Sequence, residues 1–363
     1  MAGKVALILS VGYGEGHNAA GRALVQEFAS RGWRVEMVDC CQMAHPRIYE
    51  ITRKFYQFCV RTAPWLWAIT YAQTATADWA AKATAPILRD VTECIEALVN
   101  EMKPDVILCT YPLFAHMLDY LREEGRVNVP YAVVVTDSLE ISRPWMVTKA
   151  PMIFLPDEHS LKLVSERYAL SPNRLYAAGF PVRREFALRS GRSAPTPSTL
   201  RLVYGAFAPL YRVKSDLQAI IATYPEAHVT VICGERYREL KQFASDKVIV
   251  CKRTDNMPEL FSRSHFYIGK SGAATMFEAY SSGLPMIVNY ALPGQEQGNL
   301  ALLLLDGAGV TARTTLDLMV KLKVLMAEGA KGWSRLSAAM LSANRGRGAI
   351  AIAEAVESAL LYE

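Results

Sequence analysis

The sequence predicts an α/β protein of two Rossmann-like domains, each built on a parallel sheet. Short apolar runs recur along the 363 residues and alternate with segments of helical pattern, as in parallel sheets that are covered on both faces. The apolar content of 51% is comfortable for two cores and makes the chain long for one. Ligands of such sheets bind beyond the carboxyl ends of the strands, so we expect the two domains to face each other across a cleft.

The expected strands are short apolar runs bounded by turn residues or by helical segments. In the first domain they are Val5–Ser10, Arg34–Val38, Val106–Thr110, Ala132–Thr136, Met152–Leu155 and Leu175–Ala178. In the second domain they are Leu202–Tyr204, His228–Cys233, Val248–Cys251, Phe266–Ile268 and Met286–Val288.

The domain boundaries follow from composition. Residues 1–186 hold the first set of strands, and residues 187–199 form a linker that is rich in Ser, Pro, Arg and Gly. Residues 200–345 hold the second set. An Ala-rich helix in residues 346–363 could pack back across the first domain.

A glycine-rich loop follows the first strand and ends in a histidine. Gly12, Gly14 and Gly16 match the dinucleotide-binding pattern only in part, and a lone glycine loop is weak evidence. His17 opens a helical pattern that continues through Ser30. An imidazole at a helix start, facing the ends of parallel strands, is well placed to act as a general base, although it could instead bond a backbone carbonyl.

Asp137 follows the apolar run Tyr131–Thr136 and is expected at the carboxyl end of a strand. There it could orient His17, bind a substrate, or simply cap the next turn.

The stretch from Gly269 to Asn299 is the most informative part of the chain. It predicts a strand end, a small-residue turn, a helix, a glycine stop, a strand and a polar loop. The turn at Ser271–Ala273 would present free N–H groups and the positive end of a helix dipole, which suits a diphosphate. Glu278 could reach a hydroxyl-bearing group on that phosphate, and the loop Pro293–Asn299 offers side chains suited to sugar hydroxyls. Phosphate, ribose and sugar contacts in this order indicate a nucleotide-sugar site.

The net charge and the cysteine pattern indicate which binding partners and which cellular compartment to expect. The formal net charge of +5 fits anionic lipid headgroups or phosphorylated ligands, and the lack of a dense Lys/Arg block argues against nucleic acid. The seven cysteines include no C-x-x-C pair, which predicts a reducing cytoplasm without a disulfide framework or a zinc site. No signal peptide and no apolar run long enough for a transmembrane helix is expected.

Residues 47–86 combine many aromatic side chains with Arg and Lys. Trp65 and Trp67 lie in this segment, and so do Phe55, Phe58 and Arg61. Such a mixture suits a membrane interface, but an ordinary helical insertion whose aromatics fill a core would have the same composition.

Ordered motifs extend over most of the chain. They are Gly12–His17, Lys103–Ile107 with Thr110–Pro112, Val135–Asp137 with Trp145, Gly179–Arg183, and Pro293–Glu296 with Asn299. Together they resemble the motifs of monogalactosyldiacylglycerol synthases and processive diacylglycerol glucosyltransferases, in the glycosyltransferase family 28 branch of the GT-B fold. Several motifs in order are far more specific than any one of them.

The resemblance implies GT-B architecture and an inverting transfer of a hexose from a UDP-sugar to a lipid hydroxyl at the inner face of the cell membrane. It implies a catalytic role for His17 and Asp137. The implied donor-binding residues are Arg183, Gly205, Lys270, Ser271, Gly272, Ala273, Glu278, Gln295, Glu296 and Asn299. The implied acceptor-binding residues are Gly14, Gly16, Trp65, Trp67 and Trp145. No metal or other cofactor is expected, and the expected partners are the donor, the lipid acceptor and an anionic membrane surface.

The chain departs from the family pattern at its glycine loops. Ser271 and Ala273 stand where the family usually has Pro and Gly, and Ser271 could cap the helix that follows. The loop Gly205–Pro209 keeps one glycine, and Arg212 or Lys214 could supply charge there. Two alternatives therefore stay open: a GT-B enzyme with another glycolipid or a soluble acceptor, or an inactive relative that binds nucleotide or membrane.

Overall fold

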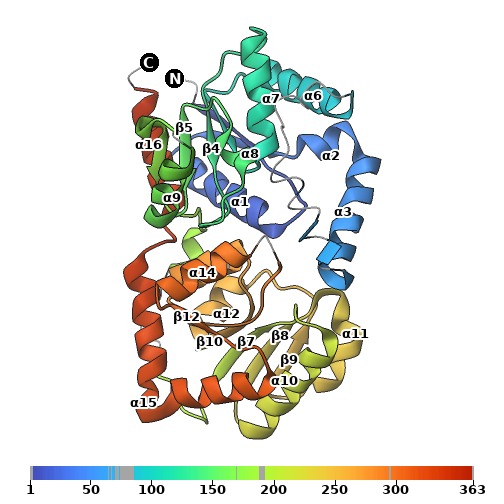
Figure 1. The fold of residues 1–363 in the computed structure, drawn as a ribbon, viewed down its shortest axis with the longest axis vertical. Coiled ribbons are helices and arrows are strands. Elements are labelled where there is room, and N and C mark those ends of the chain that lie inside the picture. Colours follow the sequence, from blue (N-terminus) through green and yellow to red (C-terminus); the bar gives the residue numbers. More distant parts are fainter. Residues whose placement is uncertain are drawn as a thin grey trace. The chain divides into compact units, whose positions relative to one another are not determined.

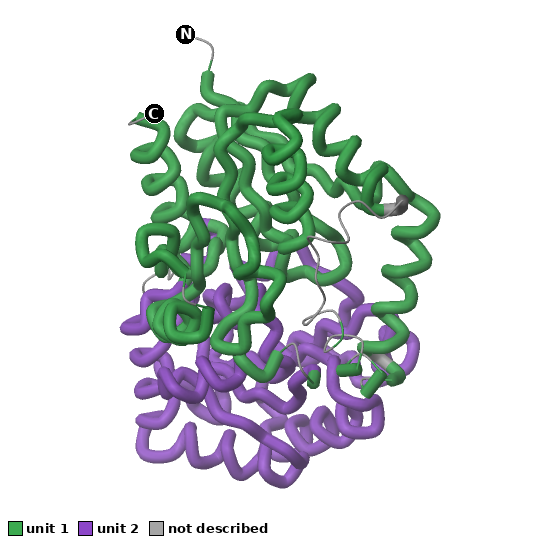
Figure 2. The backbone as a smooth tube through the Cα atoms, turned by 45° about the horizontal axis from the view of Figure 1, so that its top comes forward, with its two compact units in different colours: residues 1–183, 293–298, 346–363 green, residues 184–292, 299–345 purple. Residues whose placement is uncertain are grey.

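The computed structural model describes residues 3–63, 65–66, 68–69, 73, 86–168, 170–187, 193–293 and 296–361. The chain divides into two compact units, which Figure 2 colours separately. Unit 1 comprises Met1–Arg183, Pro293–Gly298 and Gly346–Glu363, and unit 2 comprises Arg184–Leu292 and Asn299–Arg345. Each unit holds a six-stranded sheet.

The sheet of unit 1 is parallel throughout, with strand order β2-β1-β3-β4-β5-β6. Figure 1 labels two of its strands, β4 and β5. Its strands are β1 Val5–Leu9, β2 Arg34–Val38, β3 Val106–Cys109, β4 Tyr131–Val134, β5 Met152–Leu155 and β6 Leu175–Ala177. The helices are α1 Glu15–Ser30, α2 Cys40–Ala44, α3 Pro46–Thr62, α6 Pro86–Met102, α7 Pro112–Glu123, α8 Arg143–Met146, α9 Glu158–Tyr168 and α16 Gly348–Ala359, with the 3-10 turn η1 Pro172–Arg174. Strands β1, β3 and β4 are consecutive neighbours in this sheet. The segments that follow them are distant in sequence but lie together at the carboxyl edge of the sheet.

Both faces of this sheet are buried because successive strand residues point to opposite sides. Leu7, Ile107 and Val133 pack with helices α6 and α7 on one face. Their neighbours Ile8 and Leu108 pack with α1 and α16 on the other face. The strands are therefore apolar at almost every position, which is why they could be recognised from sequence.

Helix α16 returns to unit 1 from the far end of the chain. It packs against α1, and its Glu357 accepts a hydrogen bond from Arg31 Nη1 at 2.8 Å and another from Trp33 Nε1 at 3.0 Å. Gly348 allows a close approach, since a Cβ there would overlap the backbone of Gly179.

Unit 2 repeats the architecture with strand order β12-β11-β10-β7-β8-β9, again parallel. Its strands are β7 Arg201–Gly205, β8 His228–Ile232, β9 Val248–Cys251, β10 Phe266–Lys270, β11 Met286–Tyr290 and β12 Gly309–Thr311. The helices are α10 Leu210–Thr223, α11 Tyr237–Leu240, α12 Met257–Arg263, α13 Ala273–Ser281, α14 Gln297–Leu305 and α15 Thr315–Ala343, with 3-10 turns η2 Arg184–Phe186, η3 Gly234–Arg236 and η4 Lys241–Phe243. Helices α10 and α15 pack on one face of the sheet, over a core that includes Leu202, Val229 and Ile268.

The prediction of two parallel α/β sheets is confirmed, and every expected strand is present. The sequence analysis missed β12, because its three residues Gly309–Thr311 are too few to form a recognisable apolar run. Of the expected linker, the described residues 193–199 form no helix or strand. Among the described residues, no helix is both long enough and apolar enough to cross a membrane.

Candidate active site

In unit 1, the predicted site residues gather at the carboxyl ends of β1, β3 and β4. Helix α1 begins at Glu15 with Gly14 as its N-cap, so that Gly16 and His17 lie in its first turn. The chain beyond β3 supplies Thr110, and the chain beyond β4 supplies Thr136.

Two oxygen atoms hold the His17 imidazole. Its Nδ1 lies 2.7 Å from the carbonyl oxygen of Thr110 and 3.0 Å from Oγ1 of Thr136. A carbonyl oxygen can only accept, so Nδ1 carries the proton and Nε2 keeps its lone pair. The Thr110 contact uses only Nδ1, so Nε2 can accept a proton, as a general base requires. Both threonines lie in motifs named in the sequence analysis, which did not predict their contacts with His17.

The surroundings of His17 keep it neutral. Part of the side chain reaches solvent, but the protein around the ring excludes enough water to lower the pKa of His17 to about 4, a shift that the Thr110 hydrogen bond opposes. The Tyr111 ring lies edge-on to it at 5.1 Å between centroids, and the Trp145 ring lies at 6.0 Å. At neutral pH the imidazole is thus uncharged and sits against aromatic rings.

Asp137 holds Trp145 rather than His17. Its Oδ2 accepts a hydrogen bond of 2.7 Å from the indole Nε1 of Trp145. Burial raises the pKa of Asp137 to about 6, although the Trp145 hydrogen bond works in the opposite direction. Of the three roles considered for Asp137, the orientation of His17 belongs instead to Thr110 and Thr136, and Asp137 fixes one of the rings beside the imidazole.

Asp39 and Tyr49, which the sequence analysis did not single out, hold the glycine loop. The backbone N–H of Gly12 donates to Asp39 Oδ2 at 3.0 Å, and Asp39 Oδ1 caps α2 by accepting from the Gln42 N–H at 3.0 Å. Tyr49 hydrogen-bonds Asp39, and a Cβ at Gly12 would overlap the Tyr49 hydroxyl. Gly12 is therefore required by this close approach.

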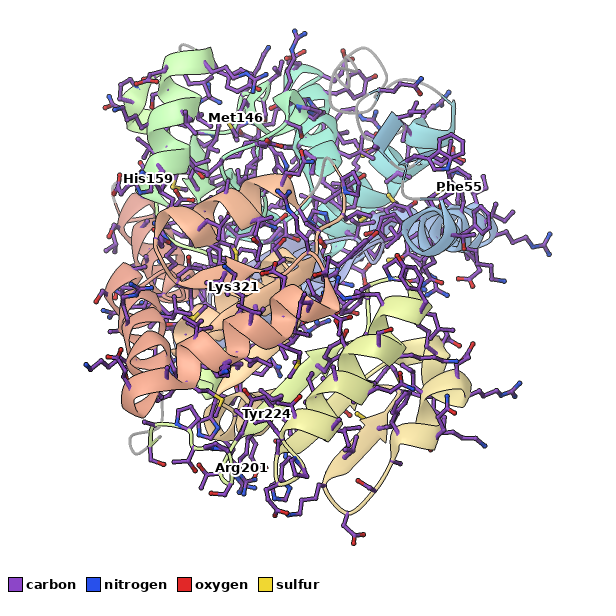
Figure 3. The ribbon with its side chains drawn as sticks, turned by 60° about the horizontal axis from the view of Figure 1, so that its bottom comes forward. Phe55, Met146, His159, Arg201, Tyr224 and Lys321 are labelled. Atoms are coloured by element: carbon purple, nitrogen blue, oxygen red, sulfur yellow. The ribbon has the colours of Figure 1, made fainter. Side chains whose placement is uncertain are left out.

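Helix α3 has two distinct faces. On the inner face, Tyr49 stacks on Tyr13 at 5.2 Å, and Thr52 is 3.0 Å from the Tyr13 hydroxyl. The outer face is apolar and exposed: Ile48 is 40% exposed, Ile51 67%, Phe55 46% and Phe58 54%. Phe55 is labelled beside α3 in Figure 3. Tyr49 fills the core, as one of the two explanations for this segment has it, whereas Phe55 and Phe58 are exposed and leave the membrane interface a prediction.

The chain beyond α3 is described only in part. Trp65 is 65% exposed and Ile69 is 50% exposed, both beyond the end of α3 at Thr62. Trp67 lies outside the described residues.

In unit 2, the predicted phosphate turn lies between β10 and α13. Gly272 is the N-cap of the nine-residue helix α13, which corrects the expectation that Ser271 caps it. Ser271 is fully buried, and its carbonyl accepts a hydrogen bond of 3.1 Å from Asn299 Nδ2. The first N–H groups of α13 and its positive dipole end follow directly, as expected for an anion site. Glu278 is half-buried on the same helix.

Asn299 therefore supports the turn before α13. Its side chain is 3% exposed, and its Oδ1 has no hydrogen-bond partner within the described part of the chain. Glu296 is buried at 4% exposure, whereas Gln295 lies outside the described residues. Arg183 is half-buried and is the last residue of the first segment of unit 1.

The loop after β7 is held by Arg236. Its Nη1 donates to the carbonyl oxygens of Ala206, at 2.9 Å, and of Ala208. Gly205 is needed at the strand end because a Cβ there would overlap the Tyr267 hydroxyl. Nearby, Lys270 Nζ lies 5.0 Å from the centre of the Phe207 ring, a cation–π contact.

The expectation that Arg212 supplies charge to this loop is wrong. Arg212 is 8% exposed, and its Nε donates to Asp216 Oδ1 at 2.6 Å. Asp216 is fully buried and also accepts from the Tyr204 hydroxyl at 2.9 Å and from Thr315 Oγ1 at 2.7 Å. The guanidinium thus serves a buried structural network.

Two family models match the chain. Residues 17–182 match the model for monogalactosyldiacylglycerol (MGDG) synthase, and residues 206–305 match the glycosyltransferase family 28 C-terminal domain. Among curated proteins, the processive diacylglycerol beta-glucosyltransferase of Bacillus cytotoxicus is 27% identical over 348 residues, which cover 90% of this chain and 86% of that protein.

Solved structures share the fold at low sequence identity. The glycotransferase of kitacinnamycin aligns with a TM-score of 0.63 and 14% identity, over 96% of this chain and 97% of that one. The UDP-GlcNAc 2-epimerase of Neisseria meningitidis, bound to UDP-GlcNAc, aligns with a TM-score of 0.60 and 12% identity, over 98% of this chain and 100% of that one. The fold is thus common to a transferase and an epimerase, so that the fold alone does not decide between them. From the two matching family models, the ordered motifs and the GT-B fold, the chain belongs to the monogalactosyldiacylglycerol synthase and processive diacylglycerol glucosyltransferase family, within glycosyltransferase family 28.

Proposed function

We propose that this protein transfers a hexose from a UDP-sugar to the hydroxyl of a diacylglycerol-like lipid, with inversion at the sugar carbon. The observation that carries the proposal is the His17 imidazole, whose Nδ1 donates to the Thr110 carbonyl and whose Nε2 keeps its lone pair. The name of the B. cytotoxicus relative supports the acceptor class.

The reaction needs a proton acceptor and a stabilised leaving group. His17 Nε2 takes the proton of the acceptor hydroxyl while the hydroxyl oxygen bonds to the sugar carbon, and the bond from that carbon to the diphosphate breaks. An imidazole whose pKa is about 4 is a weak base on its own. The negative charge of the donor diphosphate would raise that pKa in the complex, because an opposite charge favours the protonated ring.

The donor is proposed to bind at α13. The N–H groups at Ser271–Ala273, the dipole of this helix and Arg183 would stabilise the charge that develops on the leaving diphosphate, without an obligate metal. Glu278 is proposed to bind the ribose hydroxyls. The donor sugar would be bound by Gln295, Glu296 and Asn299.

The acceptor is proposed to reach the site from a membrane. The exposed apolar face of α3, with Ile51, Phe55 and Phe58, suits insertion at the headgroup boundary, and the inner face of α3 contacts the glycine loop through Tyr49. We therefore propose a peripheral association with the anionic inner face of the cell membrane.

A transfer assay with radiolabelled UDP-hexoses and diacylglycerol in mixed vesicles tests the proposed chemistry. His17→Ala is expected to lower the rate by at least about 100-fold, the usual contribution of a general base. His228→Ala is the matched control, because His228 is exposed at the start of β8 in unit 2. A His17→Ala enzyme with full rate would refute the assignment of the base. UDP binding without transfer to any acceptor in a panel would instead support an inactive relative.

Vesicle flotation tests the proposed membrane contact. The double variant Ile51→Glu/Phe55→Glu is expected to lose binding to vesicles that contain phosphatidylglycerol, because it places two carboxylates on the apolar face of α3. Leu316→Glu/Val324→Glu is the matched control on α15, where these residues are 75% and 62% exposed. If the α3 variant floats with vesicles as the wild type does, the outer face of α3 is not the membrane contact and this part of the proposal is refuted.

A further inference from the structure

We propose that Cys40 and Cys94 form a reversible disulfide in the folded protein, next to the residue that holds the glycine loop. Cys40 opens α2, Cys94 lies on α6, and these two helices pack against each other in unit 1. The Cys40 and Cys94 side chains are hydrogen-bonded to each other. Cys40 belongs to the buried core cluster of unit 1 and Cys94 packs against the same cluster, so a bond between the two sulfur atoms needs little movement.

The two thiols differ in their exposure to solvent, so that one can meet an oxidant first and the other can then form the disulfide. Cys40 is fully buried, whereas Cys94 is partly exposed and can meet a small oxidant. The hydrogen bond from Cys40 lowers the pKa of Cys94, which favours the reactive thiolate form of the more accessible of the two thiols. Burial raises the pKa of the neighbouring Cys41 to about 12, which makes that thiol a poor competitor.

The chemistry requires an oxidant of the hydroperoxide class. The Cys94 thiolate attacks the peroxide oxygen and becomes a sulfenic acid, while water leaves after protonation. The Cys40 sulfur then attacks the Cys94 sulfur, the S–S bond forms and a second water leaves. In total the two thiols lose two electrons and two protons, and one hydrogen peroxide is reduced to two waters. A dithiol such as dithiothreitol reverses the oxidation.

The position of the pair links it to the candidate active site. Cys40 follows Asp39 directly, and Asp39 both caps α2 and accepts the hydrogen bond from Gly12. An S–S bond of about 2.05 Å is shorter than any contact between two thiols, so we expect a small shift of α2 toward α6 when the bond forms. Asp39 would shift with α2, which would weaken its hydrogen bond to Gly12 in the glycine loop.

Peptide mass spectrometry tests the disulfide itself on the full-length protein. The reduced protein is treated with hydrogen peroxide, its remaining thiols are alkylated, and the digest is searched for linked peptides. We expect a peptide pair joined through Cys40 and Cys94 that disappears after dithiothreitol. It should be absent in Cys94→Ser and present in the matched control Cys251→Ser, a partly exposed cysteine in unit 2. A digest in which Cys94 is joined to Cys41, or is oxidised without any partner, overturns the proposal even if a variant fails to fold.

The transfer assay tests the link to the glycine loop, and this arm alone rests on the proposed function. Oxidation of the wild type is expected to lower the rate by about tenfold or more, since small displacements near reacting groups have effects of that size. Dithiothreitol should restore the rate, and Cys94→Ser should be insensitive. A Cys40–Cys94 disulfide that leaves the rate unchanged would overturn the link to Asp39. An enzyme without any transfer activity, but with the disulfide, would instead contradict the proposed function.

Discussion

The carboxyl edges of the two sheets use polar side chains in opposite ways. In unit 1, the strand-end residues Thr110 and Thr136 orient one imidazole and leave its Nε2 lone pair available. In unit 2, Tyr204, Arg212 and Asp216 bond mainly to one another and to nearby backbone. The part of that edge suited to an anion is a helix N-terminus flanked by small residues. Under the proposed function, the edge in unit 1 would act through a side chain and the edge in unit 2 through backbone N–H groups, so substitutions should affect the two edges differently.

The largest expected effect on stability is in unit 2. Asp216→Ala leaves the Arg212 charge buried without its carboxylate, so we expect the free energy of unfolding to fall by about 3–5 kcal/mol. Urea denaturation measures this change, and the exposed Asp246→Ala is the control, with an expected change of less than about 0.5 kcal/mol. If Asp216→Ala were as stable as the control, the network would not hold α10 to the strand ends.

Gly12→Ala should show the opposite pattern, with activity more affected than stability. The added methyl overlaps the Tyr49 hydroxyl, and we expect a stability cost of about 1–3 kcal/mol together with a large loss of transfer rate. Gly14→Ala is the matched control for stability alone, because its Cβ would lie 3.5 Å from the Tyr56 hydroxyl, an ordinary contact. Tyr49→Phe should partly rescue the thermal stability of Gly12→Ala. An unaltered melting temperature in Gly12→Ala would show that the loop moves away from Tyr49.

The smallest expected effect depends on pH. The pKa of Asp137 is raised to about 6, so its contribution to stability is present at low pH and is lost as the pH rises through 6. Asp137→Asn keeps an oxygen that can accept from Trp145 and removes the buried charge, so the variant should exceed the wild type at pH 8 by about 1–2 kcal/mol and match it near pH 4.

His17 has the opposite effect on the pH dependence of stability. Between about pH 6.5 and 4 the imidazole of the unfolded chain binds a proton and that of the folded protein does not, so the free energy of unfolding decreases as the pH falls. Thermal melts from pH 4 to 8 separate the two residues, with Asp246→Asn as the control. A lower melting temperature for Asp137→Asn at pH 8 would mean that the Trp145 hydrogen bond needs the carboxylate.

The sequence was sufficient for the strands and for placing His17 and the turn before α13 beyond strand ends. Buried parallel strands are continuous apolar runs, and only β12 was too short to be recognised. Contacts between residues that are distant in sequence could not be predicted. Thr110 and Thr136 meet His17 only because β1, β3 and β4 are neighbours in the sheet, and strand order is not visible in a single sequence.

One miss was avoidable. Arg212 and Asp216 are four residues apart on a helix, a spacing that predicts an ion pair, and weighing it would have removed Arg212 from the donor site. By contrast, no local pattern connects Asp39 with Gly12, because their hydrogen bond depends on β2 lying beside β1.

The return of α16 to unit 1 has a consequence for biosynthesis. Ribosomes complete unit 2 before they reach residues 348–359, so the part of the first sheet's face that α16 covers stays exposed until translation is nearly finished, although α1 already covers the rest. The first half of the chain therefore cannot finish folding as it emerges, and chaperone holding of the nascent chain should matter more for this protein than for one whose domains are contiguous in sequence.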